Sequence, residues 1–207
     1  METKADVYGS RLAGLIGPDS KLTSLSLRSN KIGDKGAIAL SQALRNNFKL
    51  SMLNLFDNDI SDVGGTELMK SLVHNVALRE LLVGKNKLTT VTLNTFADVL
   101  NKYSLESDEV EERKMIEQQW AVAKKGDGKK KPAKGAPPPP ELPALTALEE
   151  VDGAFFVKGN QTLEVLNLGY NCVDDEGATA FCSKIELAEA VQPPMRDFDA
   201  RDFDARS

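Results

Sequence analysis

The chain has 207 residues, of which 41% are hydrophobic and 28% charged, values typical of a soluble globular protein with one compact domain. Its net charge of -5 argues against a dedicated nucleic-acid-binding protein, because such a protein needs a basic face. Two cysteines are too few for a disulfide scaffold, and no apolar run approaches the roughly 20 residues of a membrane-spanning helix. The composition therefore predicts a cytoplasmic protein in a reducing compartment, with no membrane segment and with nucleic acid disfavoured as a partner.

Residues 1–19 are predicted to form an N-terminal cap. Leu12, Leu15 and Ile16 lie at helical spacing before a Gly-Pro pair. Because a stack of repeats exposes apolar residues at its ends, a short helical segment here would shield the first repeat.

From residue 20 onward the sequence repeats with a period of 28 residues. Each unit reads L-x-x-L-x-L-x-x-N, with an aliphatic residue two positions after the Asn. Three units fall in residues 20–103, and a fourth begins 85 residues after the third. Such a fixed period predicts a solenoid. The matching positions are Leu22, Leu25, Leu27, Asn30 and Ile32; Leu50, Leu53, Leu55, Asn58 and Ile60; Leu78, Leu81, Val83, Asn86 and Leu88; and Leu163, Leu166, Leu168, Asn171 and Val173.

The alternating leucines of each unit predict a short strand with one buried face, and successive strands are expected to run in parallel. The Asn that follows turns the chain. Its side-chain amide is predicted to satisfy backbone groups of neighbouring repeats that would otherwise be unpaired. Asn30, Asn58, Asn86 and Asn171 are therefore assigned a structural role.

After each turn, apolar residues spaced three and four apart predict an amphipathic helix, as in residues 34–44. Asn47, Asn75 and Asn160 each stand three residues ahead of the next leading leucine and are predicted to close the helices. Each unit is thus a strand, a turn and a helix. The expected fold class is an α/β solenoid, a horseshoe with parallel strands on its concave face and helices on its convex face.

The segment 30–44, NKIGDKGAIALSQAL, resembles the repeat of ribonuclease-inhibitor-like leucine-rich-repeat proteins. The resemblance covers residues 20–103 and 148–190. The resemblance is specific for the fold, and it implies that the protein binds other proteins. It does not indicate which protein is the partner, because this architecture hosts many unrelated functions. The same class includes Ran GTPase-activating proteins, tropomodulin-type caps and several ciliary proteins.

The repeat is broken over residues 104–147. Leu105 is near the register of a strand, but Asp108 and Glu109 stand where core residues belong, and buried unpaired carboxylates are costly. A charged helix is predicted from residue 109 to residue 125 instead. A stretch rich in Lys and Pro follows it and cannot form a core.

Ile116 and Trp120 lie on one stripe of that charged helix and are the candidate anchor of the insertion. Two interpretations stay open: the stripe packs back on the horseshoe, or it docks on a partner protein. The lysines between residues 124 and 134 are either a solvated linker or a site for acidic surfaces such as tubulin tails, anionic lipid or nucleic acid.

Residues 148–192 are predicted to hold the final repeat. Val151, Phe155, Phe156 and Val157 are interpreted as part of a helix that precedes its strand. The interruption would then end before residue 148.

Residues 193–207 are predicted to be a C-terminal tail, which starts at a Pro-Pro pair and contains Arg-Asp-Phe-Asp-Ala twice. The tail is either a mobile end or a short adhesive peptide in which Phe198 and Phe203 dock on a partner.

No catalytic or metal-binding pattern is recognisable in the sequence. His74 is the only histidine and falls at the end of a repeat helix, so neither a Ser-His-Asp triad nor a zinc site has support. The glycines near residue 126 lack the spacing of a phosphate-binding loop. We therefore expect no enzymatic activity, no cofactor and no metal ion.

Side chains that alternate with the conserved leucines are predicted to face the concave surface. Several are apolar although the repeat does not require it, which indicates a protein-binding surface. The alternative is that the insertion folds over them. The candidate contact residues are Arg28, Met52, Asn54, Phe56, Asp57, Glu80, Leu82, Lys85, Val165 and Tyr170.

Two function classes remain. The favoured one is a non-catalytic protein-binding scaffold, a structural subunit of a large assembly, for which the resemblance to ciliary proteins suggests the axoneme of the cilium or flagellum. The alternative is a regulatory module for a small GTPase or another enzyme, as in the Ran GTPase-activating proteins. None of their functional residues can be mapped onto this chain.

Overall fold

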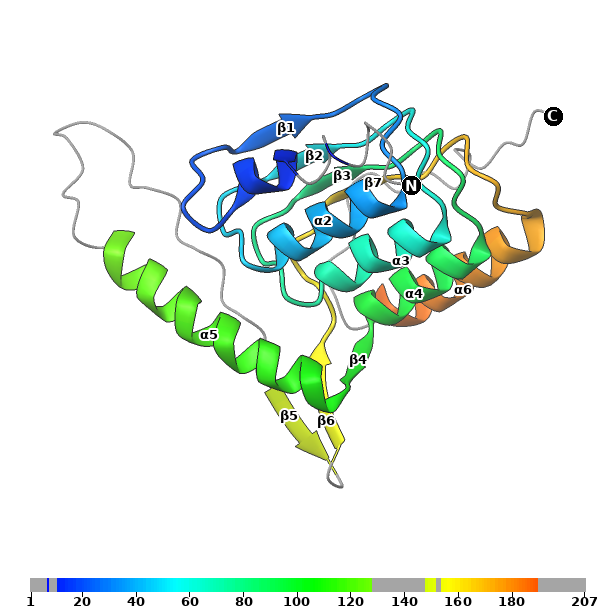
Figure 1. Cartoon of the computed structure of the whole chain (residues 1–207). Helices are drawn as coiled ribbons and strands as arrows, with labels where there is room; N and C mark the ends of the chain where they lie inside the picture. Colours follow the sequence, from blue (N-terminus) through cyan, green and yellow to red (C-terminus); the bar gives the residue numbers. More distant parts are fainter. Residues whose placement is uncertain (1–6, 8–10, 128–147, 152–153, 190–207) are drawn as a thin grey trace, which may run out of the picture.

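The computed structural model describes residues 7, 11–127, 148–151 and 154–189. Figure 1 shows two layers, a parallel sheet in the order β1-β2-β3-β7 and a row of helices, α2, α3, α4 and α6, that covers one of its faces. A second sheet, in the order β4-β6-β5, and the long helix α5 project from one end of these layers. The predicted α/β solenoid is confirmed.

Each repeat contributes one strand and one helix, as the sequence pattern predicts. The strands pair in register, so that Leu25, Leu53, Leu81 and Leu166 are direct neighbours across the sheet. The strands are β1 (Ser24–Ser26), β2 (Met52–Asn54), β3 (Glu80–Leu82) and β7 (Val165–Asn167), and the helices are α2 (Asp34–Arg45), α3 (Asp62–Ser71), α4 (Thr90–Leu100) and α6 (Asp175–Glu189).

The core lies between the sheet and the helices. The repeat leucines of β2 and β3 are fully buried there, and so are Leu40, Leu68 and Phe96 on the helices. The rings of Phe96 and Phe181 pack 5.9 Å apart and join α4 to α6. At the N-terminal end, the short 3-10 helix η1 (Gly14–Ile16) buries Ile16 against the stack, whereas Leu15 is exposed.

Asparagine side chains join successive repeats where the strands end. The Asn58 amide accepts from the backbone N–H groups of Asn30 (3.1 Å) and Ile32 (2.9 Å), and donates to the carbonyls of Leu27 (3.0 Å) and Leu55 (2.8 Å). The Asn171 amide forms the equivalent four bonds, and the Asn86 amide forms three of them, without a bond from the Asn58 N–H group. Asn30, in the first repeat, is exposed, and its side chain donates to Arg28 only. The predicted ladder therefore holds from the second repeat onward.

A second ladder of asparagines lies at the other end of the strands, where the helices close. The Asn75 side chain donates to the carbonyls of Leu44 (2.7 Å) and Asn47 (2.9 Å), which belong to the preceding repeat. Asn47 and Asn160 are bound in the same way, and all three are buried. Their predicted role in closing the helices is confirmed.

A third ladder, not anticipated from the sequence, caps α3 and α4, each from the preceding repeat. Asp34 accepts from the backbone N–H groups of Ser61 (2.8 Å) and Gly64 (3.0 Å), and Asp62 accepts from those of Thr89 (2.8 Å) and Thr92 (3.3 Å). Burial acts to raise the pKa of Asp62, but hydrogen bonds from Thr89 and Thr92 outweigh it and hold that pKa below its usual range. The helix N-termini are thus tied together across repeats.

The chain leaves the solenoid at Lys102 and returns to it at Gly159. Between them lie β4 (Lys102–Leu105), α5 (Ser107–Asp127), β5 (Leu148–Val151) and β6 (Ala154–Lys158). Because β3 pairs directly with β7, the 85 residues between their repeats contain one period plus this excursion. The predicted charged helix corresponds to α5, and the Lys- and Pro-rich stretch after it lies largely outside the described residues, as does the C-terminal tail.

The helix predicted around Val151, Phe155, Phe156 and Val157 is wrong. These residues form β5 and β6, and β6 pairs antiparallel with β4. Aromatic and β-branched residues favour strands, but the decisive partner, β4, is far away in the sequence. The excursion therefore extends to Lys158 and includes residues that the sequence analysis placed in the final repeat.

Candidate protein-binding surface

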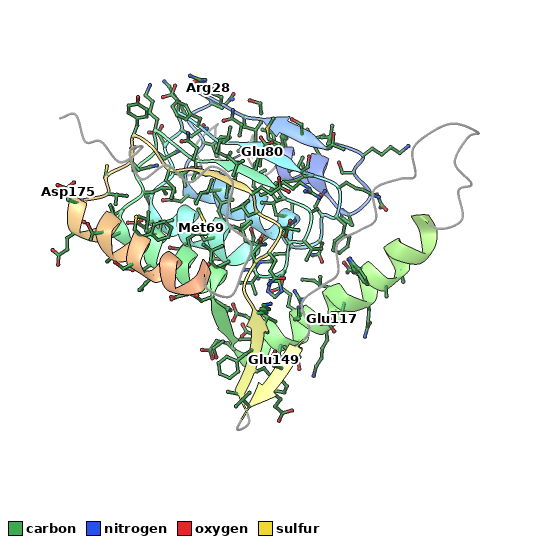
Figure 2. The ribbon with its side chains drawn as sticks, turned by 180° about the vertical axis from the view of Figure 1, so that it is seen from behind. Arg28, Met69, Glu80, Glu117, Glu149 and Asp175 are labelled. Carbon is green, nitrogen blue, oxygen red and sulfur yellow. The ribbon has the colours of Figure 1, made fainter. Side chains whose placement is uncertain are left out.

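The sheet face opposite the helices brings the ten concave candidates together. Met52, Glu80 and Val165 are neighbours in one cross-strand row, and Asn54 and Leu82 are neighbours in the next. The other five candidates follow the strands, in the turns that lead to the helices: Arg28, Phe56, Asp57, Lys85 and Tyr170. Figure 2 shows this side of the molecule, with Arg28 and Glu80 labelled.

An aromatic ridge, defined here as Arg28, Phe56 and Tyr170, crosses these turns. The Arg28 guanidinium carbon lies 4.7 Å from the centre of the Phe56 ring, a cation–π contact. The Phe56 and Tyr170 rings meet edge to face, with centroids 6.5 Å apart. Tyr170 is 78% exposed. Three side chains from three repeats thus form one surface feature.

Gly84 creates the space in which the Phe56 ring lies. A Cβ atom on Gly84 would come within 2.9 Å of Phe56 Cδ2 and 2.8 Å of the Gly169 carbonyl oxygen. The Phe56 ring can therefore lie beside the third repeat and reach Tyr170 in the fourth. Phe56 and Tyr170 were both predicted on this face from the sequence, but their contact was not, since it depends on a glycine in the repeat between them.

The backbone at Tyr170 is left-handed, with a φ of 61°. Ser29, Asp57 and Lys85, at the same position of the other repeats, have φ values of 59°, 59° and 53°. The repeat thus requires this turn, but an exposed aromatic residue is an unfavourable choice for it. The fold gives no reason for Tyr170, which makes it a candidate contact residue.

A basic rim, defined here as Arg28, Lys31, Lys85 and Lys87, lies in the turns that follow the first and third strands. Lys85 pairs with Asp57 at 2.8 Å, and Lys87 pairs with Asp59 at 2.7 Å. Hydrogen bonds from Lys85 and Ser29 lower the pKa of Asp57, and the bond to Asp59 raises the pKa of Lys87. Within the described part of the chain, Arg28 and Lys31 have no carboxylate within ion-pair distance. The rim therefore carries an excess of positive charge.

Helix α5 packs at the opposite end of the strands. Ile116 is buried against Phe48 and Val76, which lie in the turns that lead from helices into strands, and Trp120 packs on the same cluster. Of the two interpretations of the Ile116 and Trp120 stripe, the structure shows the one in which it packs on the horseshoe. In Figure 2, Glu117 of α5 lies far from Arg28.

Polar contacts add to this docking. Arg113 is fully buried, and its Nη1 atom donates to the carbonyl of Val73 (3.1 Å), just beyond the end of α3. Glu112 pairs with Arg45 at 2.5 Å. Sequence reasoning missed Arg113, because a cation on a charged helix gives no local sign that it points inward. The C-terminal end of α3 favours a cation, and the Glu117 carboxylate lies 3.4 Å from Arg113 Nε; both offset the cost of burying this charge.

His74 lies in the same region and is buried, with its Nδ1 atom unbonded. Burial, together with the charges of Arg113 and Arg45, lowers the pKa of His74 to about 3, so the imidazole is neutral at pH 7. It follows the end of α3, as predicted. Among the described residues, no group of three His, Cys, Asp or Glu side chains is arranged to hold a metal ion, and no helix is both long and apolar enough to cross a bilayer.

The docking of α5 predicts a clear difference between two neighbouring substitutions. Ile116→Ala should detach the distal part of α5, because it removes apolar contacts from a fully buried position, whereas Met115→Ala should have little effect because Met115 is 59% exposed. Trp120 is the only tryptophan, so its fluorescence reports the change directly. We expect a red-shifted emission for Ile116→Ala alone; an unshifted spectrum would contradict this packing.

Comparison with known proteins agrees with the fold. A family model described as "Leucine Rich repeat" matches residues 19–41, 46–69 and 159–182. No curated protein sequence matches the chain. Among solved structures, the leiomodin-1 actin-binding site 2 is similar over 90% of this chain and 75% of that chain, with 12% identity and a TM-score of 0.50. The tropomodulin C-terminal domain of Caenorhabditis elegans is similar over 91% of this chain and 95% of that one, with 15% identity and a TM-score of 0.42.

The repeat matches fall on the strands and helices of the first, second and last repeats, and the likeness to the leiomodin-1 domain supports the same fold. At this level of identity the likeness bears on the fold alone. With its parallel sheet, covering helices and asparagine ladders, the chain has the leucine-rich-repeat fold.

Proposed function

We propose that this protein is a non-catalytic scaffold that binds a partner protein on its concave face, as a subunit of a cytoskeletal assembly. The observation that carries the proposal is the aromatic ridge. Exposed aromatic and arginine side chains that meet on one surface are typical of the anchors that dominate protein interfaces.

The repeat itself does not account for the ridge. The positions equivalent to Arg28 and Phe56 in the other two repeats are Gly84 and Gly169, so the turn forms without any side chain there. Met52, Leu82 and Val165 extend the apolar surface from the ridge onto the sheet, and each is only half-buried. Together with the ridge they offer apolar contacts, interspersed with Glu80 and Asn54, that a partner could cover.

The class of partner rests on analogy. One similar solved structure is named as an actin-binding site, and the repeats resemble those of ciliary proteins. We therefore place actin and tubulin first among the candidate partners, with the ciliary axoneme as the preferred assembly. The lysines of residues 124–134 offer a second contact for an acidic surface such as a tubulin tail.

The combined substitutions Phe56→Ser and Leu82→Ser should abolish partner capture and leave the fold intact, because both side chains lie on the face turned away from the helices. The matched control is Val63→Ser with Val91→Ser, two exposed valines (62% and 58%) on the helix side. Capture of the native assembly by each variant, with circular dichroism to check folding, tests this prediction. Equal capture by the two double variants would refute the concave face as the binding surface.

The identity of the captured protein separates the two function classes. Cross-linking from Lys85 and Lys87 to actin, tubulin or another subunit of an assembly would support the scaffold. Cross-linking to a small GTPase would support instead a regulatory module of the Ran GTPase-activating kind.

A further inference from the structure

The ridge and the basic rim together specify the chemistry of a ligand. The ridge offers an apolar contact between Phe56 and Tyr170, and the rim adds cations from the turns of the first and third repeats. Arg28 is part of both features, and neither it nor Lys31 has a carboxylate partner within the described part of the chain. The best complement is an extended segment in which an apolar side chain is flanked by carboxylates.

The chain contains that chemistry twice. In the tail, Phe198 stands between Asp197 and Asp199, and the five-residue unit is then repeated around Phe203. Residues 196–207 also contain three arginines beside their four aspartates, so the complementary charge lies in the two Asp-Phe-Asp triplets and not in the tail as a whole. We propose that this tail, residues 193–207, is an intramolecular ligand of the concave face, with a phenylalanine against the ridge and aspartates on Arg28 and Lys31. The inference rests on the proposed function, because it identifies a competitor for the same surface.

The length of the tail suits this site. In the first repeat the chain runs from the end of α2 at Arg45 to the turn residue Asp57, and in the second from the end of α3 at Ser71 to Lys85. Helix α6 packs beside α4 and ends at Glu189. Phe203 lies 14 positions after Glu189, within the range of these two spans, whereas Phe198 lies only 9 positions after it. The tail can therefore cross from the helix end to the turn at Tyr170 without further chain.

Such a tail would control access of the partner. A short linker gives the tail an effective concentration of about 1 mM, so a tail that binds with a dissociation constant of about 100 µM weakens any competing ligand about tenfold. A partner must then supply enough contacts to displace it. The full chain is expected to bind a weak ligand poorly although the surface itself is competent.

The test compares the full-length chain with a full-length variant that carries Phe198→Ala and Phe203→Ala. The probe is a fluorescent peptide with the sequence of residues 193–207, and its binding is followed by anisotropy. We expect the variant to bind the probe about tenfold more tightly than the wild-type chain. Adding Phe56→Ser to the variant should abolish binding, adding the control Val63→Ser should not, and binding should weaken as salt is raised.

Equal binding of the probe to the wild-type chain and the tail variant would overturn the proposal, as would binding that survives Phe56→Ser. A wild-type dimer in sedimentation that the tail substitutions dissolve would also overturn it, since the tail would then bind a second copy. Partner capture distinguishes this failure from that of the proposed function. If capture still depends on Phe56 and Leu82, the face binds a partner and only the tail inference fails.

Discussion

Asn58→Ala is expected to lower the free energy of unfolding by about 3–5 kcal/mol, whereas Asn30→Ala should lower it by about 1 kcal/mol or less. The two residues occupy the same position of successive repeats. The Asn58 side chain is the partner of the Asn30 and Ile32 N–H groups and of the Leu27 carbonyl, all in another repeat. Removing it leaves several backbone groups unpaired, each at a cost of about 1–3 kcal/mol where it is buried.

Asn30 provides the matched control because, among the described residues, its side chain makes no bond to another repeat. Its side chain is exposed and donates only to Arg28, two residues away, so water can replace the lost bond. Urea unfolding of the two variants and the wild-type chain measures both effects. Equal destabilisation by the two substitutions would show that the ladder contributes little to stability and that the asparagine acts only within its own turn.

Gly159→Ala is expected to lower the free energy of unfolding by about 4 kcal/mol or more. The chain re-enters the solenoid at this glycine, which lies directly against the backbone at the end of α4. A Cβ atom there would collide with the carbonyl oxygens of Leu100 and Asn101, at the end of α4. Backbone cannot give way as a flexible side chain can. The pairing of β4 with β6, which begins at Lys102 and Lys158, should be lost first.

Gly14→Ala is the control for this second prediction, since a Cβ atom on Gly14 would meet nothing within 4 Å. Its effect should be within about 0.5 kcal/mol. Urea unfolding gives the stabilities, and hydrogen exchange of the β4 and β6 amides shows whether the small sheet opens before the solenoid. Unchanged protection of these amides in Gly159→Ala would mean that the excursion does not depend on this close approach.

The features that could be predicted are those that repeat. A Leu or an Asn at one offset in several units marks the same environment each time, so the strands, the convex helices and both asparagine ladders follow from the period. The concave positions follow as well, because they alternate with the buried leucines. Asp34 and Asp62 obey the same period, and their position at the first residue of α2 and α3 was a usable sign of the third ladder.

The excursion gave no such sign. Taken alone, the apolar segment of β6 is too short to distinguish a strand from a helix. Its pairing partner β4 is distant in the sequence and lies beside it only in the folded chain. Arg113 is indistinguishable in the sequence from the exposed charges around it on α5, yet it is fully buried. Local periodicity reports which face of an element is apolar, and it does not report which distant element will cover that face.

The sequence by itself thus determined the solenoid, its register and the set of residues on its concave face, because these depend on contacts between equivalent positions of neighbouring repeats. Tertiary structure alone decided that α5 packs where the strands begin, away from the aromatic ridge at their ends. It also decided that Phe56 reaches Tyr170 across Gly84. Both outcomes depend on contacts between positions that are not equivalent, and no repeat pattern encodes them.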